Sequence, residues 1–140
     1  MSVTTIEVIS FGYLHGAPPE ATVTVDLRRH FRDPHADPGL RHLTAHDLPV
    51  RRAVLTTPGV REAIAAVASV VEAFDAGPSP APLTVAVGCA GGRHRAATVA
   101  QVLADRLRKA VGPVDLIHRD LGKPVVERPA TGDTVAPAGA

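Results

Sequence analysis

Glycines and arginines cluster between residues 88 and 95, a combination suited to binding phosphate. The stretch reads Gly88-Cys89-Ala90-Gly91-Gly92-Arg93-His94-Arg95. Glycine lets backbone N–H groups turn inward toward an anion, and arginine adds charge-assisted, bidentate hydrogen bonds. The stretch follows the apolar run Leu83 to Val87 and precedes a segment with helical periodicity, so a helix N-terminus adds further free N–H donors. We therefore predict a phosphate-binding loop over residues 88–95.

A purely structural interpretation of this loop stays open. In it, the glycines serve only tight packing between a strand and a helix, and the two arginines are solvated. The loop is not a Walker A motif, because no Gly-Lys-Ser or Gly-Lys-Thr sequence occurs in the chain. This absence disfavours ATP or GTP hydrolysis of the usual kind.

A second chemistry is embedded in the same loop. Cys89, Gly92 and Arg95 match the Cys-x-x-Gly-x-x-Arg cradle of cysteine-dependent phosphatases, in which a thiolate attacks phosphorus and arginine clamps the oxygens. Ala96 stands where those enzymes carry Ser or Thr, and Gly88 replaces their usual His. A lone cysteine at a strand end is most often a small buried hydrophobic residue. Catalysis by Cys89 and Arg95 is therefore the alternative hypothesis, and a non-catalytic binding loop is the first.

The seven histidines raise the question of a metal site. His42 and His46 have the spacing of ligands on a helix, but the sequence around them is a poor helix former and zinc needs three or four ligands. We expect no metal and no cofactor. His35 differs from the others because Pro34 and Pro38 hold it in a stiff loop, where its imidazole can face an anionic ligand.

Arginine outnumbers lysine in this chain, which gives RNA binding its own physical case. Only Phe11, Tyr13, Phe31 and Phe74 are aromatic, so base stacking is poorly supplied and any binding relies on shape and charge. Neighbouring acids can also neutralise much of the surface, leaving no RNA site. The candidate RNA-binding arginines are Arg28, Arg29, Arg41, Arg51 and Arg52.

Length and composition restrict the kind of protein that carries these residues. A chain of 140 residues is enough for one domain. A net charge of +1 makes the whole chain no general polyanion binder, and the single cysteine excludes an internal disulfide. No apolar run is long enough to span a bilayer, and the N-terminus has no signal-peptide pattern. We expect a cytoplasmic protein without membrane contact.

The elements that position the loop follow from hydrophobic patterning. Runs rich in β-branched residues predict strands at Val3–Phe11 and Thr22–Leu27. Apolar residues at steps of three and four predict a helix that begins at Pro58 and ends at Gly77, with the stripe Val60, Ile64, Val67, Val71 and Phe74. The segment from Arg29 to Thr57 has no sustained period, so we expect a long ordered loop with one short helix at most.

The second half of the chain predicts a βαβ crossover. A strand at Leu83–Val87 leads through the glycine loop into a helix beginning near His94, and a strand at Val114–His118 follows. The helix stripe is Val99, Val102, Leu103, Arg106 or Leu107, and Ala110. The predicted fold is a single small α/β domain over residues 1–123 with a mixed, mostly parallel sheet. Residues 124–140 are predicted to be a disordered tail.

A further set of residues resembles one family closely. The chain is similar to the C-terminal domain of the RapZ/YvcJ family of RNase adapter and nucleotide-binding proteins over about residues 10–123. The resemblance rests on the following residues: Ser10-Phe11-Gly12-Tyr13, Gly16, Asp26-Leu27-Arg28, Pro34-His35, Pro38, Leu40-Arg41, Leu43-Thr44, Asp47, Pro49-Val50, Gly88-Cys89-Ala90-Gly91-Gly92, His94-Arg95 and His118-Arg119-Asp120-Leu121.

The resemblance implies a non-catalytic α/β binding domain. In that family this domain binds RNA, and in the RNase adapter branch it senses glucosamine-6-phosphate and delivers a small RNA to an endoribonuclease. A phosphorylated metabolite, RNA, a ribonuclease or a separate nucleotide-binding protein, and a second copy in a homodimer are thus the expected partners. Together with the loop argument, the resemblance gives this ligand set: His35, Ala90, Gly91, Gly92, Arg93, His94, Arg95 and Arg119.

Three departures from the family pattern bear on these expectations. Ala90 stands where the family usually has Thr, which removes a hydroxyl that could bond phosphate, and Ala96 stands where Ser is usual. The chain is also one residue longer between Asp26 and His35, which shifts the far wall of the expected pocket. The sequence lacks the nucleotide-binding half of the family, so we expect ligand binding to be kept more readily than the adapter role.

Overall fold

The sheet that positions the glycine loop has four parallel strands. The computed structural model describes residues 5–126, and within them the strand order is β2-β3-β1-β4. The strands are β1 (Ile6–Gly12), β2 (Val23–Asp26), β3 (Leu83–Cys89) and β4 (Asp115–His118). Every strand pair is parallel, so the expectation of a mostly parallel α/β sheet is confirmed, and the described residues contain no antiparallel pair.

The two central strands carry the core and end side by side. β1 and β3 pair along their whole lengths, so Gly12 lies opposite Cys89 at the carboxyl end. β3 is two residues longer than the predicted Leu83–Val87, because Gly88 and Cys89 still pair with β1. The glycine loop proper therefore begins at Ala90. In open α/β sheets this carboxyl edge is where ligands bind.

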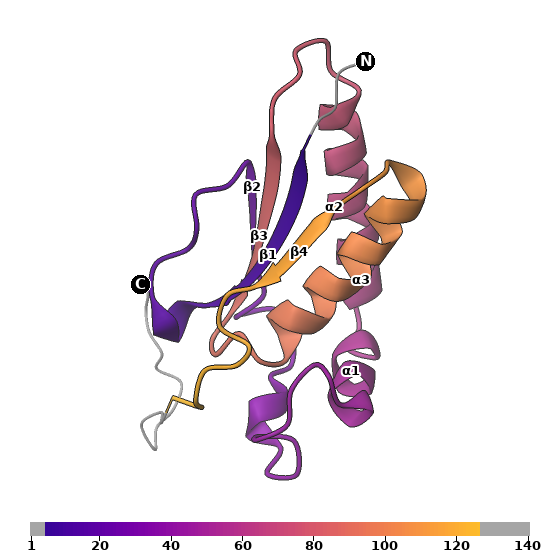
Figure 1. Ribbon diagram of the computed structural model, residues 1–140. Helices are drawn as coiled ribbons and strands as arrows, with labels where there is room; N and C mark the ends of the chain where they lie inside the picture. The colour runs from indigo at the N-terminus through magenta and orange to yellow at the C-terminus, as the bar shows by residue number, and fades with distance from the viewer. Residues whose placement is uncertain (1–4, 127–140) are drawn as a thin grey trace.

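The order of the strands explains why the helices lie on one face. The connections β2 to β3 and β3 to β4 run in the same direction across the sheet, so two right-handed crossovers place their helices on the same side. Figure 1 shows α2 and α3 on that side and the coil between β1 and β2 on the other. That coil contains η1 (Tyr13–His15), which packs near the end of β1.

The two long helices bury most of the predicted apolar positions, and individual positions and helix ends differ by one or two residues. α2 (Val60–Asp75) begins after Gly59, two residues later than expected, and buries Val60, Ile64, Ala68 and Val71. Phe74 is 53% exposed. On a helix of 3.6 residues per turn, the position that follows Val71 on the buried side of α2 is Asp75 rather than Phe74. α3 (Arg95–Ala110) buries Val99, Leu103 and Leu107 as predicted, together with small residues on the same side, whereas Ala110 and Arg106 are exposed.

The segment between residues 29 and 57 is more regular than its sequence indicated. It holds the short η2 (Pro34–Ala36) and α1 (Leu48–Leu55), whose Val50 and Val54 are buried. Pro49 lies in the first turn of α1, where the missing N–H has no intrahelical partner to lose. Figure 1 places α1 and this segment at the carboxyl end of the sheet.

The predicted tail, residues 124–140, lies beyond the described part of the chain from residue 127 onward. Within residues 5–126 no individual helix has the length and hydropathy to cross a membrane, and only α1 and α2 taken together, bent by 82°, meet those criteria.

Candidate functional site

The turn between β3 and α3 is wedged against the end of β1. A Cβ on Gly12 would lie 2.4 Å from the carbonyl carbon of Gly91, so only glycine permits this approach of the two backbones. Gly92 has a φ of +77°, a left-handed conformation that favours glycine. Gly88 lies under Phe11, with 2.4 Å between a built Cβ and the Phe11 ring. The glycines therefore serve close packing, and the packing fixes where the loop amides point.

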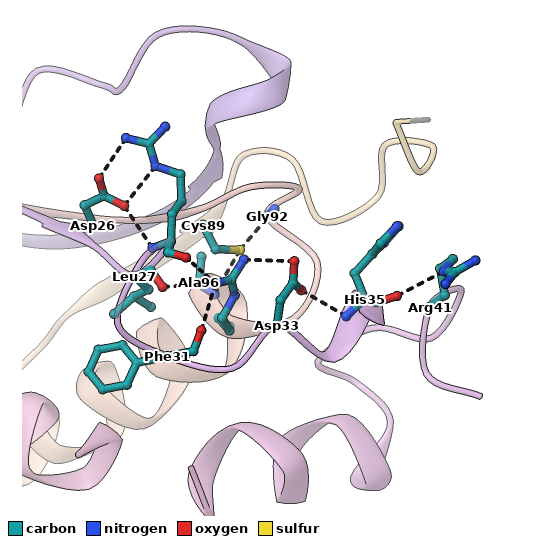
Figure 2. Close-up of polar contacts among 11 residues, drawn as sticks. Asp26, Leu27, Phe31, Asp33, His35, Arg41, Cys89, Gly92 and Ala96 are labelled. Carbon is teal, nitrogen blue, oxygen red and sulfur yellow. Dashed lines mark hydrogen bonds and ion pairs between the residues drawn. The ribbon is translucent and has the colours of Figure 1, made fainter. Parts of the chain in front are cut away.

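The loop folds around the sulfur of Cys89. The N–H groups of Gly92 and Ala96 both donate to Cys89 Sγ at 3.3 Å, as Figure 2 shows. The Cys89 residue is 2% exposed. Ala96 supplies a backbone donor at the position where a phosphatase would also supply a hydroxyl. The loop thus has the shape of a thiolate cradle without the hydroxyl that assists departure of the thiolate.

Arg95 is buried and ties the loop to a distant segment. Its Nη1 donates to the carbonyls of Leu27, Arg28 and Phe31 at 3.0, 3.1 and 3.2 Å. Its Nη2 lies 3.2 Å from Asp33 Oδ2. The side chain is 3% exposed, and its Nε has no hydrogen-bond partner among the described residues. Arg95 therefore connects the loop to residues 27–33. Its Nε–H is the one donor that has no acceptor among the described residues.

Arg93 and His94 bind two other segments of the chain, one at residues 42–43 and one at Lys123. Arg93 donates from Nη1 to the carbonyl of Lys123 at 3.0 Å and from Nη2 to the carbonyl of His42 at 2.9 Å. Its Nε is buried and also lacks a partner within residues 5–126. His94 Nε2 lies 2.8 Å from the carbonyl of Leu43. Both side chains therefore bind neutral carbonyl oxygens of neighbouring segments.

These groups line one cavity, which we call the loop cavity. The space between them measures about 310 Å³, a figure that includes open solvent. Its lining residues are Leu14, Asp33, His35, Cys89, Gly91, Arg93, His94, Arg95, Val125 and Val126. The sequence-predicted residues His35, Gly91, Arg93, His94 and Arg95 are thus brought together. Ala90 and Gly92 are buried in the adjoining backbone.

Arg119 lies outside this lining, next to the buried Asp120. Arg119 Nε and Nη2 donate to Asp120 Oδ2 at 3.0 and 2.8 Å, and the N–H of Gly12 donates to the same oxygen at 2.8 Å. Burial alone would raise the pKa of Asp120, but these donors and Lys123 lower it to about 2 from 3.8. Asp120 therefore stays ionised and fastens the end of β1 beside the loop.

Two histidines near the site have lowered pKa values. Burial lowers the pKa of His94, and burial followed by the charge of His46 lowers the pKa of His118. His118 Nδ1 lies 2.6 Å from the hydroxyl of the fully buried Ser10. Both rings are consequently held neutral in the folded protein at pH 7.

These directions give a pH dependence of stability. The unfolded chain binds protons to these two histidines at a higher pH than the fold does, so stability is present above about pH 6.5 and is lost as the pH falls toward the lower folded pKa values. Urea unfolding at pH 5 to 8 should show a plateau above pH 7 and a fall of up to about 1.4 kcal/mol per pH unit for each histidine below 6.5. H118N should flatten part of this slope. An equal free energy of unfolding at pH 5 and pH 8 would contradict the assignment.

The candidate RNA-binding arginines lie at the same end of the molecule, but some are exposed and others are held by contacts with neighbouring groups. Arg29 and Arg52 are exposed. Arg28 pairs with Asp26 and lies 3.5 Å from the centre of the Tyr13 ring. The other two donate to backbone carbonyls: Arg41 to His35, and Arg51 to Ala45 and His46.

Sequence reasoning missed four lining residues: Leu14, Asp33, Val125 and Val126. Asp33 had a usable signal, because Asp before Pro34 is a common start for a helical turn, and its carboxylate accepts the N–H of His35. Within residues 5–126 no three His, Cys, Asp or Glu side chains converge as a metal site would require. His42 and His46 are exposed.

Comparison with known proteins gives one consistent result. A sequence profile described as the RapZ C-terminal domain matches residues 4–122. A nucleotide-binding protein of Thermobifida fusca is 41% identical over 119 residues, and one of Rubrobacter xylanophilus is 43% identical over 124; these alignments cover 83% and 84% of this chain. A nucleotide-binding protein of Limosilactobacillus reuteri is 35% identical over 121 residues. The chain spans about 40% of the length of these relatives.

Proposed function

Since this chain belongs to the RapZ C-terminal domain family, we propose that it is a non-catalytic module that binds a phosphorylated small molecule in the loop cavity. One observation carries the proposal. The Nε donors of Arg93 and Arg95 are buried without hydrogen-bond partners among the described residues, and both residues line that cavity. A buried donor without an acceptor costs about 1–3 kcal/mol, more when it is charged. A phosphate oxygen is the kind of acceptor that would satisfy both.

The mixed charge of the cavity supports an amino-sugar phosphate as the ligand. Arg93 and Arg95 supply positive charge, whereas the carboxylate of Asp33, which is paired with Arg95 and 25% exposed, lies in the same lining. A ligand with a phosphate at one end and an ammonium group at the other complements both signs. His35, held between two prolines, adds an imidazole. The relatives are named nucleotide-binding proteins, so a nucleotide phosphate is the ligand to compare.

Binding should be measurable as a thermal shift of the full chain. We expect glucosamine-6-phosphate at ten times its dissociation constant to add about 1.4 kcal/mol, which raises Tm by about 4 °C. R93Q should lose most of this shift, since the substitution removes the guanidinium. R106Q, at an exposed position of α3, is the matched control and should keep it.

Three comparisons make the result specific. Glucosamine without phosphate and a nucleoside monophosphate should give smaller shifts than the amino-sugar phosphate. Absence of any shift with millimolar ligand would contradict the proposal. The same proteins should not hydrolyse p-nitrophenyl phosphate, because Ala96 lacks the hydroxyl and the Arg95 terminal nitrogens are occupied. Turnover that C89S abolishes would instead establish the phosphatase alternative.

We also propose that the arginines around the cavity bind RNA phosphates. The support is their placement: Arg28, Arg29 and Arg41 lie in the segment after β2, and Arg51 and Arg52 lie in α1. Figure 1 shows that segment and α1 at the end of the sheet where β3 leads into α3. Phosphate contacts of this kind bind by shape and charge, with little sequence readout. A ribonuclease or a nucleotide-binding protein as a partner, and a homodimer, belong to the same proposal by family membership.

Electrophoretic mobility shift with a structured RNA tests this second activity. Replacing the two exposed arginines together, R29Q/R52Q, should weaken binding and reduce the slope of log K against log salt by about 2, since each phosphate contact contributes about 0.9. R106Q should change neither quantity. Equal affinity and equal slope for the double variant and the control would rule out RNA contact at these positions.

A further inference from the structure

The last described residues line the loop cavity. β4 ends at His118, and after a turn the chain returns to the β3–α3 loop, where Val125 and Val126 line the same cavity as Cys89 and Arg95. Both valines are half-buried, whereas the preceding residues Gly122 to Pro124 are exposed. Figure 1 shows this yellow end of the described chain at the same end of the sheet as the turn between β3 and α3.

Three polar contacts hold this segment in place. Lys123 Nζ lies 2.7 Å from Asp120 Oδ1, and the N–H of Lys123 donates to the carbonyl of Asp120 at 3.1 Å. The carbonyl of Lys123 accepts from Arg93 Nη1 at 3.0 Å. Asp120 is fully buried, so the anchor for the lysine is fixed. The segment is thus attached both to the core and to a residue of the candidate site.

Arg93 contacts the segment that contains Lys123 and also lines the loop cavity. Its contact with the Lys123 carbonyl is a hydrogen bond to a neutral acceptor. An anionic oxygen adds the attraction between two full charges, which a neutral carbonyl does not offer. An anion entering the cavity therefore competes successfully for Arg93, and the segment that used this donor loses one of its three polar contacts.

We propose that residues 123–126 form a strap that closes the loop cavity over Cys89 and that an anion displaces by taking Arg93. The cover is the apolar pair Val125 and Val126, and the latch is the pair Lys123 and Asp120. The competition for Arg93 rests on the proposed phosphate-binding function, whereas the covering of Cys89 does not. The two can therefore be tested separately.

Alkylation of Cys89 by iodoacetamide, followed by intact mass, measures the strap without any ligand. V125S/V126S removes the apolar cover, and K123Q removes the ionic latch. Each should raise the alkylation rate by about fivefold or more, because local opening exposes the sulfur. V70S, at an exposed valine of α2, is the matched control and should alkylate at the wild-type rate. Circular dichroism on each variant checks that the fold is retained.

Titration of the same proteins with inorganic phosphate measures the competition. The strap variants should bind phosphate about fivefold more tightly, since a larger fraction of the molecules is open. Wild-type alkylation rates in both strap variants would overturn the proposal. Faster alkylation with unchanged phosphate affinity would overturn the competition for Arg93. Faster alkylation when no protein, wild type included, binds phosphate would refute the binding function and leave the cover in place.

Discussion

Replacing Gly12 with alanine is expected to lower the free energy of unfolding by about 3 kcal/mol and to abolish phosphate binding in the molecules that still fold. The added methyl would lie 2.4 Å from the carbonyl carbon of Gly91 and 2.8 Å from the nitrogen of Gly92. Neither contact involves a flexible side chain that can move aside. The loop must therefore shift away from β1, and the directions of its amides change with it.

Chemical denaturation gives the stability, and isothermal titration with phosphate gives the binding. Gly122→Ala is the matched control, because nothing lies within 4 Å of a Cβ built at Gly122. Wild-type stability in Gly12→Ala would show that the backbone contact between β1 and the loop does not position the loop.

Arg95→Ala should destabilise the fold by a comparable amount, about 3 kcal/mol. The substitution leaves the carbonyls of Leu27, Arg28 and Phe31 without their shared donor and leaves Asp33 without its cation. Removing one partner of a buried ion pair costs about 3–5 kcal/mol, and the value here is reduced because Asp33 is 25% exposed.

Urea unfolding measures this loss, and hydrogen exchange of the amides of residues 27–33 locates it. Arg95→Lys should recover only part of the stability, since a single ammonium cannot reach three carbonyls and a carboxylate in fork geometry. Arg106→Ala, at an exposed position, should change stability by less than about 0.5 kcal/mol. An Arg95→Ala protein as stable as Arg106→Ala would show that the tie is not structural.

The position of the glycine loop could be predicted from the sequence because its signals are local. An apolar run, three closely spaced glycines and a helical stripe fix a strand, a turn and a helix in that order. The same patterning placed β1, β2, α2 and β4 to within a few residues. The error at Phe74 arose because a step of three and a step of four from Val71 are equally compatible with a short stripe.

The role of Arg95 could not be predicted, because residue type does not reveal the partner. Its acceptors lie more than 60 residues away in sequence and are backbone carbonyls, which every residue possesses. The sequence predicted that Arg95 binds a ligand. In the structure its terminal nitrogens bind the protein, and only its Nε–H has no acceptor among the described residues. The sequence allowed one short helix between residues 29 and 57 but did not place it, for a different reason. The sequence signal for the start of α1 is Asp47 before Leu48-Pro49. The helix has only eight residues, which is too short to show a clear apolar period.

The most direct test of the phosphate-binding account is a titration of ¹⁵N-labelled protein with inorganic phosphate, followed through the backbone amide resonances. The account predicts saturable shifts at Gly91 to Arg95 and at the Nε–H signals of Arg93 and Arg95, with little change along α2. Shifts confined to exposed arginines elsewhere, or no saturation at millimolar phosphate, would show that the loop cavity does not bind phosphate.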